Sequence, residues 1–133
     1  NTKGEIIDDK LYIIGGYNGT DSFDEILIYD LNNKIWEDPI KMSVKFSSHT
    51  TSKYNGKIFI RGDYNFMNVF AVFDTNNKIF KVIESNAIDS RHLISEIVDG
   101  KFYVIGGNIT PYMSTMLDEI QVLDLENEGY FCY

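Results

Sequence analysis

Cysteine, proline, histidine and long apolar runs are all scarce in this 133-residue chain, and each scarcity excludes a class of protein. Cys132 is the single cysteine, which excludes an intrachain disulfide and a cysteine-based metal site. His49 and His92 stand at no metal-ligand spacing, so we predict no metal site. No apolar run approaches the ~20 residues that span a bilayer. With two prolines and no low-complexity tract there is no obvious linker, and we expect one continuous domain over residues 1–133.

Basic residues are also few. Twelve Lys and Arg face twenty Asp and Glu, which gives a net charge of −8 and argues against nucleic acid or anionic membrane as a partner. The polar start of the chain shows no signal-peptide pattern. Because the chain begins at Asn1 and not at Met, we expect a processed product or an excerpt of a longer chain. These residues do not identify the compartment; a soluble, cytoplasmic location is the default expectation.

Aromatic and β-branched residues are abundant, and they recur in one pattern. The stretch Leu11–Gly16 returns as Ile58–Asp63 and again as Phe102–Gly107. Each copy follows a tight-turn signal that ends in Lys, and each precedes an apolar run that ends in Asp, with an aromatic six residues later. These pairs are Asp30 and Trp36, Asp74 and Phe80, and Asp124 and Tyr130. A period of about 40–50 residues is typical of repeat architectures.

Each repeat contains four short runs that predict strands. The first strands are expected at residues 4–7, 47–53 and 92–98; the second at 11–16, 58–63 and 102–107; the third at 25–31, 69–75 and 119–125; the fourth at 34–37, 78–83 and 129–133. The third strands are apolar on both faces, which indicates sheets covered on both sides. Four-stranded sheets that stack around an axis are the blades of a β-propeller. We therefore predict an all-β fold of three four-stranded antiparallel blades, bounded at 1–40, 41–86 and 87–133, forming half or part of a ring.

These residues resemble the kelch-repeat family. Its repeat closes the second strand with a glycine doublet and then carries a Tyr and a Trp in its third and fourth strands. The first repeat has all of these: Gly15, Gly16, Tyr29 and Trp36. The third keeps Gly106-Gly107 but has Leu123 and Tyr130; the second is the most degenerate, with Gly62-Asp63, Phe73 and Phe80. The resemblance covers essentially the whole chain and implies kelch-type propeller blades.

The resemblance also implies a function. Kelch partner-binding faces are built from the residue after the glycine doublet and from the start of the first strand. This implies a non-enzymatic protein- or peptide-binding module with no cofactor and no catalytic residue. Carried over by position, and with Tyr112 added from the longest loop, the implied partner-binding residues are Tyr17, Asn18, Ser47, Ser48, Tyr64, Arg91, His92, Asn108 and Tyr112.

Three alternatives stay open. Tyr17 and Tyr64 could merely cap a channel mouth while Arg91 braces a turn between blades. Some kelch-like propellers act on carbohydrates, as sialic-acid mutarotases do; here Arg91 would hold a carboxylate and His92 or Glu96 would move protons. The chain could also be a structural part of a larger propeller.

The number of repeats leads to a further expectation. A closed propeller typically has about 4–8 blades, so three blades are too few to close a ring. They would leave the outer faces of the first and third blades exposed. Either the rest of a longer chain completes the ring, or two copies form a six-bladed ring as a homodimer. For a stable 133-residue protein we favour the dimer.

Overall fold

Strands make up all the regular secondary structure that this computed structural model describes, over residues 2–65, 68–83, 88–109, 116–126 and 129–132. They are β1 (Lys3–Ile7), β2 (Lys10–Ile14), β3 (Phe23–Asp30), β4 (Ile35–Trp36), β5 (Ile40–Phe46), β6 (Thr50–Tyr54), β7 (Lys57–Arg61), β8 (Phe70–Asp74), β9 (Ile79–Val82), β10 (Ile94–Val98), β11 (Lys101–Ile105), β12 (Ile120–Asp124) and β13 (Gly129–Cys132). Within these ranges, no helix is long and apolar enough to cross a membrane.

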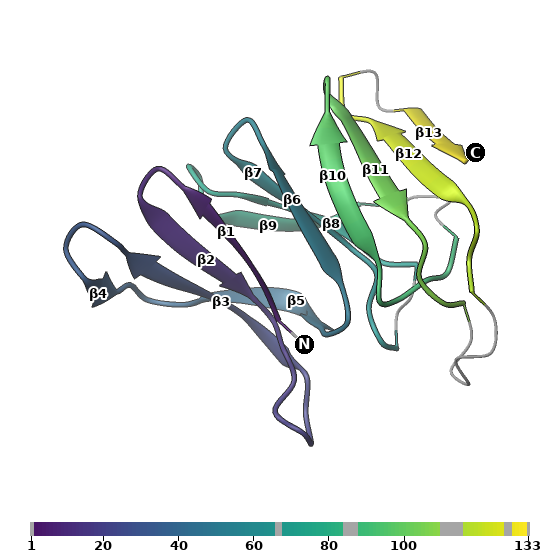
Figure 1. The fold of residues 1–133 in the computed structure, drawn as a ribbon. Helices are drawn as coiled ribbons and strands as arrows, with labels where there is room; N and C mark the ends of the chain where they lie inside the picture. Colours follow the sequence, from purple (N-terminus) through teal and green to yellow (C-terminus); the bar gives the residue numbers. More distant parts are fainter. Residues whose placement is uncertain (1, 66–67, 84–87, 110–115, 127–128, 133) are drawn as a thin grey trace.

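The strands form three antiparallel sheets. The first has the order β1-β2-β3-β4, with β5 also paired to β3; the second is β6-β7-β8-β9 and the third β10-β11-β12-β13. Figure 1 shows them side by side as an open fan, and β6 contacts both β1 and β10 from sheet to sheet. The all-β prediction with four-stranded antiparallel sheets is confirmed, and the arrangement is consistent with propeller blades.

The hairpin that opens each sheet has a two-residue turn in which both residues are left-handed. Asp8 and Asp9 have φ values of 48° and 60°, and Asn55 and Gly56 have 49° and 71°. Asp99 and Gly100 repeat the latter pair of values. Positive φ at both positions matches the twist of the flanking strands, which is why Asn-Gly and Asp-Gly favour this turn.

The hairpin between the third and fourth strands is closed by an aspartate side chain. Asp30 Oδ1 accepts the backbone N–H groups of Asn32 and Asn33, each at 2.9 Å, and Asp74 does the same in the second sheet. The left-handed residues of these two turns are Lys34 and Lys78, each with a φ of 56°, which follow the asparagines whose N–H groups the aspartate holds.

The outer strand of the first sheet is longer than the sequence indicates. Strand β4 has only two residues, but β5 continues the pairing along β3, with Glu25 opposite Lys41 and Ile26 opposite Ile40. The expected fourth strand ended at Glu37. Pro39 lies in the interruption, where a residue without an N–H cannot donate to the ladder.

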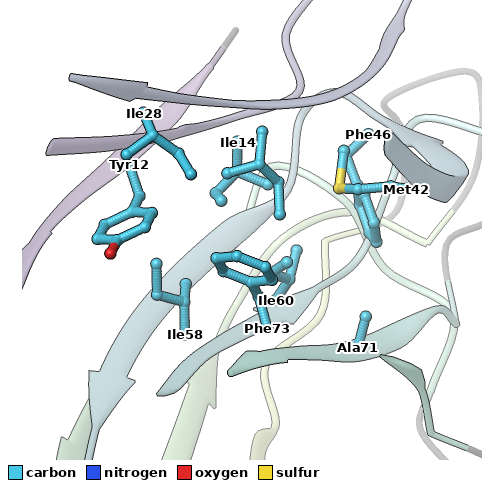
Figure 2. Packing of buried hydrophobic residues seen from close by; sticks show 10 residues of the cluster. Tyr12, Ile14, Ile28, Met42, Phe46, Ile58, Ile60, Ala71 and Phe73 are labelled. Carbon is cyan, nitrogen blue, oxygen red and sulfur yellow. The ribbon is translucent and has the colours of Figure 1, made fainter. Parts of the chain in front are cut away.

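Two apolar layers fill the spaces between the sheets. Figure 2 shows the larger, in which Tyr12, Ile14 and Ile28 of the first sheet face Ile58, Ile60 and Phe73 of the second. Phe59, Phe70 and Phe102 form the centre of the layer between the second and third sheets.

Glycine allows a close backbone approach where each of the first two sheets connects to the next. A Cβ on Gly15 would lie 2.4 Å from the Phe46 carbonyl oxygen, and one on Gly62 would lie 2.7 Å from the Ser90 carbonyl oxygen. The glycines at the end of the second strand are therefore packing residues, as their recurrence indicated.

Candidate functional site

A cavity of about 700 Å³ lies at the end of the first two sheets where β2 and β7 finish and β6 begins. We call this end of the sheets the loop face; the β2–β3 loop projects from it at the bottom of Figure 1. The cavity is lined by Tyr17, Thr20, Asp21, Ser22, Ser43, Val44, Lys45, Ser47, Ser48, Asp63, Tyr64 and Asn65. Four of the implied partner-binding residues thus share one cavity: Tyr17, Ser47, Ser48 and Tyr64.

Tyr17 and Tyr64 supply large exposed surfaces at this cavity. Each side chain is 48% exposed although each is held in place. The Tyr17 hydroxyl donates to the Gly19 carbonyl oxygen at 2.7 Å, and its backbone bridges to Ser22. The Tyr64 N–H donates to the Ser47 carbonyl oxygen at 3.0 Å. Fixed, half-exposed tyrosines have little conformational entropy to lose when a partner covers them.

Ser47 and Ser48 form the wall between the tyrosines, and both are buried. The Ser47 N–H donates a hydrogen bond to Asp63 Oδ1 at 2.7 Å. The Ser47 hydroxyl accepts a hydrogen bond from the Ser22 hydroxyl at 3.0 Å. Ser48 has a left-handed φ of 58°, and its hydroxyl has no hydrogen-bond partner in the described part of the chain. The Ser48 carbonyl accepts the His92 N–H at 2.9 Å, which links this wall to the third sheet.

Arg91 lies beneath the site and not on its surface. It is only 2% exposed, and its Cζ lies 3.9 Å from the centroid of the Tyr64 ring, which is a cation–π contact. Its Nη1 also donates to the Tyr64 carbonyl oxygen at 3.3 Å. Arg91 therefore orients Tyr64, and in this position its guanidinium is not presented to solvent.

His92 and Asn108 lie beside this pair. The His92 ring meets Tyr64 edge-on at a centroid distance of 6.5 Å. Residue 92 is exposed overall, and the partial burial of its ring, followed by the charge of Arg91, lowers the pKa of His92. Asn108 is 3% exposed and exchanges both backbone hydrogen bonds with Arg91. His92 is thus near the cavity rim, whereas Asn108 supports Arg91 from behind.

Of the two remaining implied residues, the structure describes only Asn18, which does not line the cavity. Asn18 is exposed, and its Oδ1 accepts the N–H groups of Thr20 and Asp21, each at 2.8 Å, so that its side chain closes the β2–β3 loop. Tyr112 lies outside the described residues.

Asp63 is the organising residue that the sequence pattern did not single out. It stands where the other repeats have the second glycine of the doublet and is 2% exposed. One carboxylate oxygen accepts the Ser47 N–H and the other accepts the Asn65 N–H at 2.9 Å. The departure from glycine was itself a signal, since a charged residue is rarely buried without a role in hydrogen bonding.

A second cavity of about 420 Å³ lies next to the first strands and is lined by Thr2, Lys3, Ser48, His49, His92 and Leu93. Burial lowers the pKa of His49 to about 4, so the ring is uncharged at neutral pH. Within the described residues, no three His, Cys, Asp or Glu side chains gather closely enough to hold a metal ion.

Comparison with known proteins identifies one repeat directly. The family description "Kelch motif" matches residues 2–39, which correspond to the first sheet up to β4. A curated relative, the Kelch repeat-containing protein kel-10 of Caenorhabditis elegans, is 35% identical over 51 residues. That match covers 38% of this chain and 9% of the relative, so the chain corresponds to a small part of that protein's length.

Proposed function

We propose that this chain, which carries a kelch motif and is a distant homologue of a kelch-repeat protein, is a non-enzymatic module. We propose further that it binds a protein or a peptide. The partner would dock on the loop face over the 700 Å³ cavity. The observation that carries this proposal is the convergence of Tyr17, Ser47, Ser48 and Tyr64, from two repeats, on that cavity.

The chemistry of the cavity suits a peptide. Two tyrosine rings offer apolar surface with a polar edge, and tyrosine is among the residue types most enriched at binding hot spots. Hydroxyl groups of Ser22 and Ser43, and the charges of Asp21 and Lys45, line the same cavity and can pair with polar groups of a partner. Tyr64 rests on Arg91 and a backbone hydrogen bond, so the site is preorganised.

A selection from a random peptide library displayed on phage, with the chain as bait, tests the proposal even though the natural partner is unidentified. The dissociation constants of the selected peptides would then be measured by calorimetry for the wild type and for Tyr17→Ala and Tyr64→Ala. We expect each substitution to weaken binding by at least about tenfold, as for a hot-spot aromatic.

Trp36→Ala is the matched control, because Trp36 is also an exposed aromatic, at 60%, but lies on β4 away from the cavity. Its dissociation constants should remain within about twofold of the wild type, on the scale of a residue outside the contact. A library that yields no binder, or peptides that bind both tyrosine variants as tightly as the wild type, would contradict the proposal. Thermal melting of each variant separates loss of contact from loss of folding.

A further inference from the structure

The outer face of the third sheet repeats the apolar face that the first sheet buries. Register pairs Tyr12 with Ile28 and Ile14 with Ile26 in the first sheet, and Tyr103 with Val122 and Ile105 with Ile120 in the third. In the first sheet this face packs on the following sheet, and we call it, and the equivalent face of every other sheet, the forward face. Ile14 and Ile26 are 0% exposed, whereas their equivalents Ile105 and Ile120 are each 39% exposed.

The outer face of the first sheet has the opposite character. Its residues pair Leu11 with Tyr29 and Ile13 with Leu27, just as Ile58 pairs with Phe73 and Ile60 with Ala71 in the second sheet. We call a face of this kind, which packs on the preceding sheet, the rear face. Ala71 is 0% exposed in the second sheet, but Leu27 is 38% exposed in the first.

Forward and rear faces already pack together inside the chain. The forward face of the first sheet lies on the rear face of the second in the larger apolar layer, with the rings of Tyr12 and Phe73 at 5.9 Å. The free forward face has Tyr103 where the first sheet has Tyr12, and the free rear face has Tyr29 where the second has Phe73. The two free faces are thus the two halves of a packing arrangement that the chain uses internally.

Gly106, which follows β11 on the free forward face, has more open surroundings than the equivalent glycines of the first two sheets. Gly15 and Gly62 each lie against a backbone carbonyl of the segment that leads into the following sheet, those of Phe46 at the end of β5 and of Ser90 before β10. Within the described residues, a Cβ on Gly106 would be 4.0 Å from its nearest neighbour, the Leu117 carbonyl oxygen. Gly106 still has a left-handed φ of 66°, similar to that of Gly15. The third sheet therefore has the geometry of a sheet that receives a neighbour.

We propose that two copies of this chain dock head to tail, with the forward face of the third sheet of each copy on the rear face of the first sheet of the other. The two-fold axis makes the two junctions identical, so both free faces are buried at once. The product is a closed ring of six sheets, and propellers typically contain about 4–8 such sheets. Docking of two forward faces would instead combine surfaces that never pack together in this chain.

This proposal is independent of peptide binding on the loop face and is tested by mass in solution. Sedimentation equilibrium of the wild type should give twice the chain mass of 15.3 kDa. Ile105→Glu on the forward face and Leu27→Glu on the rear face should each give 15.3 kDa, because each places a charge in both junctions. Ile79→Glu is the control: Ile79 is 58% exposed on β9, outside both faces, and this variant should keep the wild-type mass.

An equimolar mixture of the two interface variants supplies a second readout. One junction of the mixed pair joins an unmodified forward face to an unmodified rear face, so the mixture should regain dimer that neither variant forms alone. Circular dichroism confirms that each variant is folded, and Ile105→Ser replaces Ile105→Glu if the charge prevents folding. A monomeric wild type, a series of larger polymers, or dissociation by only one of the two substitutions would overturn the proposal.

Discussion

His49 is a buried histidine that the fold holds in its uncharged form. The side chain is 2% exposed, its ring lies 5.5 Å from that of Phe46, and neither ring nitrogen has a hydrogen-bond partner in the described part of the chain. Burial is the main cause that lowers its pKa from 6.5 to about 4; the charge of Lys3 acts in the same direction, while the charge of Asp63 opposes it. Protonation of His49 is therefore linked to unfolding.

Replacement of His49 by leucine should change how stability depends on pH. The folded-state pKa is below the unfolded one, so the unfolded chain binds more protons between pH 4 and 6.5. The contribution of neutral His49 is complete above pH 6.5 and is lost as the pH falls toward 4. Over that range the free energy of unfolding of the wild type should fall by up to about 3 kcal/mol more than that of His49→Leu.

Leucine is the suitable replacement because Leu93 occupies the same repeat position before β10 and is 3% exposed. Urea denaturation at several pH values provides the measurement. If the two proteins lose stability in parallel between about pH 7 and 4, His49 is not the titrating group.

At the residue scale, the sequence predicted where site residues lie in the repeat better than it predicted whether their side chains are buried. Tyr17 and Tyr64 follow the ends of equivalent strands, so the repeat alignment alone placed them on one face. The alignment could not show that Arg91 would stack beneath Tyr64, because this contact joins residues of different repeats. Nor could it show that Ser48 and His92 adopt positive φ, an uncommon conformation for any residue other than glycine.

At the element scale, the segment that connects the first sheet to the second packs closely against a glycine that leads the doublet. Gly15→Ala and Gly106→Ala introduce the same side chain at the same repeat position and at similar φ values, 55° and 66°. Both variants incur about 1 kcal/mol for left-handed alanine. Against the described residues, only Gly15→Ala adds a clash, since its Cβ would lie 2.4 Å from the Phe46 carbonyl oxygen.

In a Leu27→Glu background, which removes the proposed self-association, we therefore expect Gly15→Ala to lower the free energy of unfolding by at least about 3 kcal/mol, and Gly106→Ala by about 1 kcal/mol. Denaturant unfolding of the two variants beside the Leu27→Glu parent measures both values. Equal losses would show that the close approach of the Phe46 carbonyl to Gly15 contributes nothing beyond backbone conformation.

Strand positions were the most predictable feature of the elements. The opening hairpins carry turn chemistry that permits few alternatives, as at Asn55-Gly56 and Asp99-Gly100. Strand β5 was not predicted, although Ile40–Phe46 alternates strictly between apolar and polar residues. Its pairing with β3 resumes only after an interruption around Pro39, and the four-strand repeat assigned no fifth strand to the first sheet. Local pattern identifies a strand, but only tertiary pairing decides which sheet receives it.

At the scale of the whole molecule, three similar sheets place equivalent loops at one end and leave one apolar face free at each side of the fan. The loops carry the proposed peptide site, and the free faces carry the proposed self-association. The repeat period predicted the sheets and their order. The cavity between the first and second sheets was not predictable, because its walls come from loops whose path the period does not fix.

The central claim is that a peptide partner docks at the cavity between Tyr17 and Tyr64. The most direct measurement is a set of amide NMR spectra of the chain recorded during titration with a selected peptide. We predict that the largest shifts fall on Tyr17, Ser47 and Tyr64, and that the amides of Leu27 and Ile105 on the free faces stay unchanged. Shifts confined to Leu27, Ile105 and their neighbours would contradict the claim.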